Sequence, residues 1–243
     1  MQPVAANACN AAIEFRNVSV VYANGAHALR NVNLCIDKGE FVFLVGPTGA
    51  GKSTLLKLVY REVLPTEGSV WVEGEDVTRL PRHRVPYLRR RIGVVFQDFR
   101  LLPQRTVYEN VAYALHVIGA PYREIRRRTA AAVELVGLTR KADALPHQLS
   151  GGEQQRASIA RAVVNNPHIL LADEPTGNLD PEMSQEIAQV LNDINIRGTT
   201  VVVASHDAAI VNALRKRVVT LEGGVVSRDE SRGGYTADES QTP

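Results

Sequence analysis

The sequence of 243 residues has little or nothing of several features that mark particular classes of protein. It has only two cysteines, too few for the disulfide framework of a small secreted domain. No apolar run approaches the roughly 18 residues that a membrane-spanning helix needs. The net charge of +2 is too small to indicate nucleic-acid binding by itself. We therefore expect a cytoplasmic globular protein that binds no nucleic acid and acts on a membrane only through a partner.

The two ends of the chain lack the pattern of a folded element. Residues 1–12 are mostly small and have neither the basic start nor the strong apolar stretch of a secretory signal, so we expect a flexible leader. Residues 229–243 are polar and contain glycine and serine, so we expect a flexible tail. The folded domain is expected to span residues 13–228.

Short apolar runs alternate with helical patterns along most of the chain. Runs typical of buried strands lie at residues 41–45, 92–96, 169–172, 201–204 and 218–221, and half-buried strand patterns lie at 13–21 and 33–36. Helical periodicity covers residues 52–60, 182–196 and 208–216. This alternation predicts an α/β core with a mainly parallel sheet. Further helical patterns at 106–117, 122–136 and 153–164 predict a helical insertion over about 98–160.

One glycine-rich segment has the pattern of a phosphate-binding loop. Directly after the apolar run 41–45, the chain reads Gly46-Pro47-Thr48-Gly49-Ala50-Gly51-Lys52-Ser53-Thr54. Glycines let backbone N–H groups point at phosphate oxygens, and the helix start adds its positive dipole end. In this pattern Lys52 reaches the β- and γ-phosphates and Ser53 holds Mg²⁺. The guanine-reading motif of a GTPase has no good match, since the nearest candidate, at residues 140–143, begins with arginine.

Polar side chains follow three other apolar runs, where ligands of parallel sheets bind. Asp173 and Glu174 end one run, which predicts an Mg²⁺ ligand followed by a general base for an attacking water. His206 is predicted to contact the γ-phosphate and that water. The amide of Gln97 is predicted to bind Mg²⁺ or to position water. The alternatives are a structural histidine and an ordinary turn glutamine.

A second glycine pair predicts a second anion-binding helix start. Ser150 can cap a helix, and Gly151 and Gly152 leave backbone N–H groups free in the segment Ser150-Gly151-Gly152-Glu153-Gln154. One fold does not readily aim two such helix starts at one triphosphate. A dimer can do so if each chain offers this turn to the nucleotide held by the other.

The order of these motifs resembles the ATP-binding cassette (ABC) family over residues 13–228. The resemblance implies a P-loop NTPase core with an N-terminal antiparallel β subdomain and an inserted α-helical subdomain. It also implies a head-to-tail homodimer on ATP binding, in which the 150–154 segment, the signature of the family, acts in trans. Asp180, in Gly177-Asn178-Leu179-Asp180, matches the D-loop. Tyr22 is implied to stack on adenine, although it could instead be a buried core residue.

The resemblance also implies a docking site for the membrane partner. Arg100-Leu101-Leu102-Pro103 follows Gln97, in the region where the family receives a helix of its partner. An apolar pair held by a proline can line a groove for such a helix. The alternative is that the two leucines pack the root of the helical insertion.

Longer stretches resemble the bacterial cell-division ATP-binding subunits of the ABC family. They are "FQDFRLLPQRTVYENVAYAL", "AGKSTLLKLVYRE", "DEPTGNLDP" and "RGGYTADES". The resemblance implies an Mg²⁺-dependent ATPase, peripheral on the cytoplasmic face of the plasma (inner) membrane. Its integral membrane partner would be FtsX-like, and the pair would control septal peptidoglycan hydrolysis. The alternatives are the ATPase subunit of a lipoprotein-releasing or macrolide-export transporter, and a scaffold whose ATP cycle serves recruitment alone.

Two basic clusters leave a further choice open. They comprise Arg79, Arg82, His83, Arg84 and residues 89–91, and Arg123, Arg126, Arg127 and Arg128. Such clusters are usually solvated faces of helices and loops. The alternative is attraction to anionic lipid headgroups, at about 1 kcal/mol for each well-placed residue.

Overall fold

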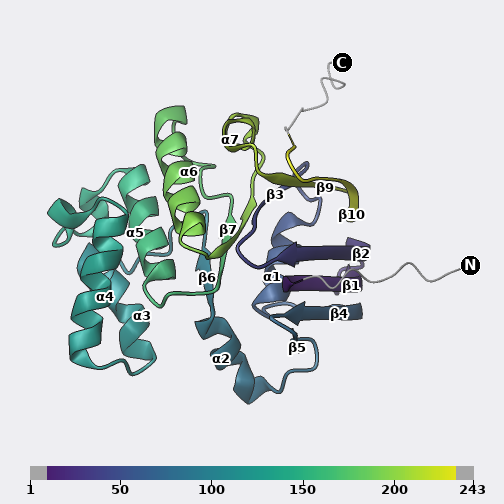
Figure 1. Cartoon of the computed structure of the whole chain (residues 1–243), viewed down its shortest axis with the longest axis horizontal. Helices are drawn as coiled ribbons and strands as arrows, with labels where there is room; N and C mark the ends of the chain where they lie inside the picture. The colour runs from purple at the N-terminus through teal and green to yellow at the C-terminus, as the bar shows by residue number, and fades with distance from the viewer. Residues whose placement is uncertain (1–9, 234–243) are drawn as a thin grey trace, which may run out of the picture.

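The structure is a computed structural model that describes residues 10–233 (Figure 1). Most of the expected leader (1–9) and most of the expected tail (234–243) lie outside the described residues. At both boundaries the folded part is longer than the sequence predicted. Strand β1 begins at Ala11 and strand β10 ends at Glu230.

A mixed sheet forms the centre of the molecule. Its strand order is β10-β9-β3-β8-β7-β6, and only the β10–β9 pair is antiparallel. The predicted α/β core with a mainly parallel sheet is therefore confirmed. The strands are β3 (Phe41–Val45), β6 (Ile92–Val95), β7 (Ile169–Asp173), β8 (Thr200–Ala204), β9 (Arg217–Glu222) and β10 (Val225–Glu230).

A second, antiparallel sheet lies beside the first in Figure 1, as the family resemblance implied. Its order is β2-β1-β4-β5, formed by β1 (Ala11–Val21), β2 (His27–Asp37), β4 (Glu67–Val72) and β5 (Glu75–Asp76). The patterns at 13–21 and 33–36 identified β1 and part of β2. Strands β4 and β5 were not predicted, because glycine and charged residues interrupt their short apolar patterns.

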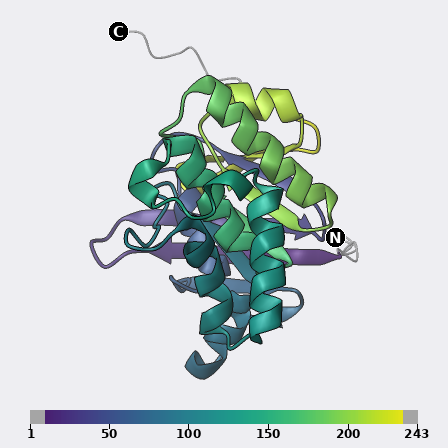
Figure 2. The same ribbon diagram turned by 90° about the vertical axis from the view of Figure 1, so that its left-hand side faces the viewer.

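Helices cover the other face of the mixed sheet. Figure 2 shows the insertion helices and α6 in front of the strands. The insertion consists of α3 (Val107–Val117), α4 (Tyr122–Leu135) and α5 (Gly151–Val163), close to the predicted ranges. The remaining α-helices in the described part are α1 (Lys52–Val59), α2 (Val85–Arg90), α6 (Pro181–Ile196) and α7 (Ala208–Leu214), of which α2 was not predicted.

The position of β3 at the centre of the sheet explains why its sequence is continuously apolar. All five of its residues are buried. Phe41, Phe43 and Val45 belong to the core under the helical insertion, whereas Val42 and Leu44 belong to the core under α1 and the antiparallel sheet. Successive strand side chains point to opposite faces, so a strand covered on both sides needs apolar residues at every position. The loop that follows β3 is thereby held on a rigid support.

No helix between residues 10 and 233 is both long and apolar enough to cross a membrane.

Candidate active site

The phosphate-binding loop connects β3 to α1 at the carboxyl edge of the mixed sheet. Lys52 is buried at the start of α1, and its Nζ donates to the carbonyl oxygens of Gly46 (2.7 Å) and Pro47 (3.3 Å). Gly46 has a φ of 139°, and a Cβ there would lie 2.1 Å from the carbonyl oxygen of Leu221, so only glycine fits. The loop brings an ammonium group to the first-turn N–H groups of a helix, a combination that suits phosphate.

Ser53 and Asp173, two of the three residues predicted to bind Mg²⁺, are in direct contact. The hydroxyl of Ser53 donates to Oδ1 of Asp173 at 2.9 Å. Burial raises the pKa of Asp173; the hydrogen bond from Ser53 opposes this rise and the charge of Glu174 adds to it. Hydroxyl and carboxylate oxygens are hard ligands that suit Mg²⁺, which commonly completes its shell with substrate phosphates and water. Between residues 10 and 233, no group of three or more His, Cys, Asp or Glu side chains could hold a metal ion.

Glu174 and His206 form a second pair beside the loop. Nδ1 of His206 lies 2.7 Å from Oε2 of Glu174, and Nζ of Lys52 lies 3.6 Å from Oε1 of the same carboxylate. Glu174 has a φ of 47°, a left-handed conformation that costs a residue with a side chain about 1–3 kcal/mol. The hydrogen bond from its N–H to the carbonyl of Ala204 (2.9 Å) holds that conformation. The carboxylate is therefore fixed between two nitrogen groups, where it can accept a proton from water.

Gln97 follows β6 and is exposed. It lines a cavity of about 420 Å³ together with Asp173 and Asn178, and the same cavity extends to Tyr60 and Arg100. The structure thus brings Gln97 close to the Ser53–Asp173 pair. Its role as an Mg²⁺ ligand or in positioning water stays a prediction.

Tyr22 follows β1 and is 37% exposed, so the alternative of a buried core residue is wrong. Its hydroxyl lies 3.0 Å from Oγ1 of Thr54, the last residue of the predicted phosphate-binding loop. The aromatic ring is accessible next to that loop, as stacking on a base requires. Stacking on adenine stays a prediction.

The signature segment begins helix α5, as predicted. Oγ of Ser150 accepts from the N–H of Glu153 (3.2 Å), and the carboxylate of Glu153 accepts from the N–H of Ser150 (2.9 Å). This reciprocal capping box defines the helix start. Asp180 caps α6 in a similar way, since its carboxylate accepts from the N–H of Met183 (2.9 Å). In Figure 1, α5 is separated from α1 by β6 and β7, so the signature lies apart from the loop of its own chain.

The corner after Gln97 has an unusual backbone. Phe99 and Arg100 both have left-handed φ angles, of 54° and 48°. Arg161 of α5 reaches across to this corner and donates to the carbonyl oxygen of Phe99 (2.7 Å) and to that of Arg100. The guanidinium of Arg100 in turn lies 3.9 Å from the centre of the Phe96 ring. The helix that begins with the signature is therefore tied directly to the corner.

The two leucines of the corner are half-buried. Leu101 packs against the core of the insertion, which supports the alternative interpretation for this residue. Leu102 is held through its backbone, whose N–H donates to Oδ1 of Asn110 (2.7 Å) and whose carbonyl accepts from Nδ2 of Asn110 (3.1 Å). Neither leucine lines the 420 Å³ cavity, whereas Arg100 does.

Sequence reasoning missed Arg161, Asn110 and Gln155. Asn110 is fully buried in α3, and Gln155 is fully buried in α5, where its amide donates to the carbonyl of Pro175 (2.7 Å). A buried polar side chain needs a partner, so a polar residue on the apolar face of a predicted helix was the available signal. The partners themselves are distant in the sequence and could not be predicted.

Comparisons with known proteins agree on one family. The family model described as ABC transporter matches residues 29–177. The chain is 53% identical over 223 residues to the cell division ATP-binding protein FtsE of Bacillus subtilis, covering 92% of this chain and 98% of that protein. It is 54% identical to the protein of the same name from Mycobacterium tuberculosis (93% and 99% covered) and 50% identical to that from Escherichia coli (87% and 96% covered).

Solved structures give the same result for the fold. The chain matches a dimeric structure of a post-hydrolysis state of the ATP-binding cassette MJ0796 bound to ADP and Pi, with a TM-score of 0.83 and 40% identity, covering 92% of this chain and all of that chain. It also matches cbiO1 from Clostridium perfringens, part of the ABC transporter complex cbiONQ, with a TM-score of 0.86 and 30% identity, covering 92% and 89%.

Proposed function

This chain belongs to the ABC transporter ATPase family, and from that premise we propose that it is the ATP-hydrolysing subunit of a membrane complex acting in bacterial cell division. The family binds and hydrolyses ATP. The cell-division assignment rests on relatives about half identical over nearly the whole chain, all named for that process. It includes an FtsX-like membrane partner and control of septal peptidoglycan hydrolysis, on the cytoplasmic face of the inner membrane.

The observation that carries the catalytic proposal is the position of Glu174. Its carboxylate lies 2.7 Å from His206 and 3.6 Å from Lys52, directly after the Ser53–Asp173 pair. Glu174 takes a proton from the water that attacks the γ-phosphate. His206 orients that water and the γ-phosphate. Lys52 and the loop N–H groups stabilise the negative charge that moves toward the leaving phosphate oxygen. Bound Mg²⁺ would be held by Ser53, Asp173 and Gln97 and would neutralise phosphate charge.

A homodimer completes each site. The capped start of α5 lies apart from the phosphate-binding loop of its own chain, and it presents free N–H groups that suit an anion. In the dimer, residues 150–154 of one chain contact the ATP bound to Lys52 of the partner subunit. A dimeric relative with ADP and Pi supports this arrangement.

The experiment that tests the catalytic proposal replaces one carboxylate oxygen of Glu174 by an amide nitrogen. Glu174→Gln keeps the size of the side chain but removes the base, so ATP binding should persist while Mg²⁺-dependent hydrolysis falls by at least about 100-fold. Size-exclusion chromatography with ATP should then show a stalled dimer. Glu134→Gln is a matched control, because that carboxylate is exposed on α4 and belongs to none of the motifs of the site. Hydrolysis at the normal rate by Glu174→Gln would refute the assigned role.

The 420 Å³ cavity beside Gln97 indicates where a helix of the membrane partner would dock. Arg100-Leu101-Leu102-Pro103 remains the proposed contact region, and the 420 Å³ cavity beside Arg100 offers apolar and charged walls from Leu56, Phe96 and Asp98. A partner helix seated there would press on the residues that follow Gln97. Arg100→Glu and Leu102→Asp should abolish co-purification of the membrane partner, whereas exposed Arg105→Glu should retain it. The identity of the co-purified protein also separates a division complex from a lipoprotein-releasing or macrolide-export transporter.

For anionic lipid, the second basic cluster is the better candidate. In the first cluster, Arg84 and Arg91 pair with Glu75 and Arg79 pairs with Asp76, which favours a solvated face. In the second, Arg123, Arg126 and Arg127 surround an open hollow beside exposed Tyr122. Salt-sensitive binding of the protein to vesicles containing anionic lipid, lost in Arg123→Glu/Arg126→Glu, is the expected result. Binding that does not change with salt or with these substitutions would contradict a lipid role.

A further inference from the structure

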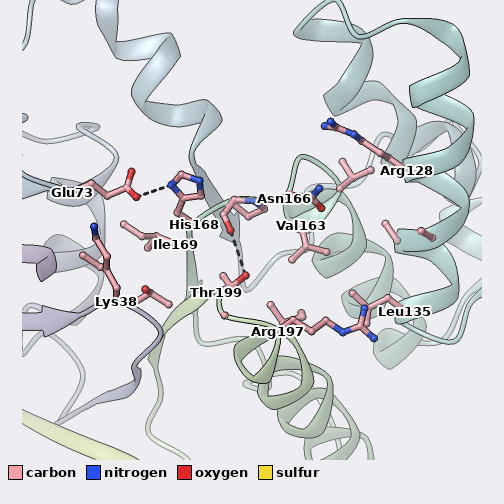
Figure 3. A pocket seen from close by; sticks show the side chains of 18 of the residues that line it. Lys38, Glu73, Arg128, Leu135, Val163, Asn166, His168, Ile169, Arg197 and Thr199 are labelled. Atoms are coloured by element: carbon pink, nitrogen blue, oxygen red, sulfur yellow. Dashed lines mark hydrogen bonds and ion pairs between the residues drawn. The ribbon is translucent and has the colours of Figure 1, made fainter. Parts of the chain in front are cut away.

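A cavity of about 590 Å³ lies at the edge of the mixed sheet opposite the phosphate-binding loop. Ile169 and Thr200, at the beginnings of β7 and β8, form part of its wall, whereas the phosphate-binding loop follows the end of β3. Lys38 from the loop after β2, Arg128 from α4 and Arg197 from the end of α6 surround it, as Figure 3 shows. The cavity therefore separates the helical insertion from the antiparallel sheet, and neither the proposed catalysis nor the proposed docking uses it.

The rim of this cavity carries positive charge that the described residues do not neutralise. Glu73 is the one carboxylate in the wall, and it already contacts His168 (2.6 Å) and Arg91 (3.3 Å). Arg128 pairs with Glu124 at 3.1 Å. The other three cations of the wall, Lys38, Arg127 and Arg197, make no ion pair with any residue between 10 and 233.

These three cations come from different elements yet border one hollow. Like charges that face one hollow repel one another, so an anionic occupant would be favoured there. Buried apolar side chains, including Val163, Ile169 and Ile194, form the floor. The cavity therefore suits a short segment that is acidic but also carries small apolar groups.

The described chain ends near this edge of the sheet. The N–H of Gly233 donates to the carbonyl of Lys216 (3.3 Å), which directly precedes β9. In the strand order β9-β3-β8, the beginnings of β9 and β8 are two strand spacings apart, roughly 10 Å. The next residues are Gly-Tyr-Thr-Ala-Asp-Glu-Ser-Gln-Thr-Pro, with carboxylates at Asp238 and Glu239 and no cation. Five residues beyond Gly233 span up to about 17 Å, enough to bring Asp238 to the cavity.

We propose that residues 234–243 bind in this cavity, with the carboxylates of Asp238 and Glu239 against Lys38, Arg127 and Arg197. Tethering gives the segment a high effective concentration, so weak ion pairs suffice to hold it. Because Arg127 belongs to α4 and Arg197 to the loop before β8, the bound segment joins the helical insertion to the sheet. Ala12, near the start of the described residues, also lines the cavity, but the chain has no carboxylate before Glu14, so the charge complementarity favours the C-terminal segment.

A zero-length carbodiimide cross-link on the full natural chain tests this. The reagent joins a carboxylate to an amine only when the two are in contact, and mass spectrometry identifies the joined peptides. The expected product links Asp238 or Glu239 to Lys38 at low salt. Its yield should fall by at least about fivefold in Arg127→Glu/Arg197→Glu, where attraction becomes repulsion, and should fall in high salt. Arg126→Glu is the matched control, since that residue of α4 does not line the cavity.

Comparing the yield of cross-links to Lys38 with the yield to a lysine outside the cavity either supports or overturns the proposal. Lys141, exposed on the insertion outside the cavity, reports random coupling of the segment, so a Lys38 product that exceeds the Lys141 product supports binding. Equal coupling to both lysines, or no Lys38 product, would overturn the proposal. A Lys38 product that persists unchanged in the double variant would overturn it as well, because the arginines would then play no part. Circular dichroism of each variant confirms that it is folded before coupling.

Discussion

Replacing Arg161 by methionine tests whether the signature helix holds the corner after Gln97. Methionine keeps most of the apolar stem but removes the donors to the carbonyls of Phe99 and Arg100. A hydrogen bond from a charged donor contributes about 1.5–3 kcal/mol, but water can replace the donor at exposed Arg100. Two left-handed residues cost about 1–2 kcal/mol each, which favours relaxation once the donors are gone. We expect the corner to lose about 2 kcal/mol of stability.

Hydrogen exchange followed by mass spectrometry measures this loss locally. A change of about 2 kcal/mol corresponds to roughly 30-fold faster exchange of the amides in residues 97–105. Arg156→Met is the control, since Arg156 lies on the same helix and pairs with Glu186 of α6 instead of with the corner. Loss of that pair should therefore leave the amides of residues 97–105 protected. If both variants exchange alike in this segment, the proposed link between α5 and the corner is wrong.

Three further substitutions test the packing around the site. Gly46→Ala should abolish ATP binding measured by fluorescent-nucleotide titration, because its Cβ would overlap the carbonyl of Leu221; retained affinity would contradict the loop geometry. Asn110→Ala should lower the free energy of unfolding in urea by about 2–4 kcal/mol, since it leaves buried groups of Leu102 and its neighbours unpaired; a loss below about 1 kcal/mol would show that water replaces the side chain. Phe43→Ala should cost about 3–5 kcal/mol in the same assay, and a smaller loss would mean that the core under the insertion collapses to fill the space.

Local patterns predicted the elements that carry the site. Ser150 indicated a helix start, and the structure has Ser150 as the cap of α5 in a capping box that Glu153 completes. The continuously apolar residues 41–45 indicated a strand covered on both faces, which β3 is. These predictions succeeded because capping and strand burial depend on residues close together in the sequence.

Contacts between distant segments were predicted less well. The sequence left open whether Leu101 contacts a partner or packs the root of the insertion, and only the structure shows that it packs on the core of the insertion. Strands β4 and β5 were not identified, since β4 is a strand through its pairing with β1, and β5 through its pairing with β4. The clamp from Arg161 joins residues about 60 positions apart in the chain. No local pattern encodes such a contact, because it depends on how the elements pack.

The sequence by itself determined the kind of chemistry, because the phosphate-binding loop, the Asp173–Glu174 pair and the signature are each complete within a few residues. The tertiary structure decided how they meet. It placed Lys52, Ser53 and Asp173 together with Glu174 and His206, and it left the signature on a separate helix. It also formed the cationic cavity at the opposite sheet edge from residues of separate elements. Distance and charge balance between segments arise only when the sheet and its helices pack, so these features are absent from any single stretch of the chain.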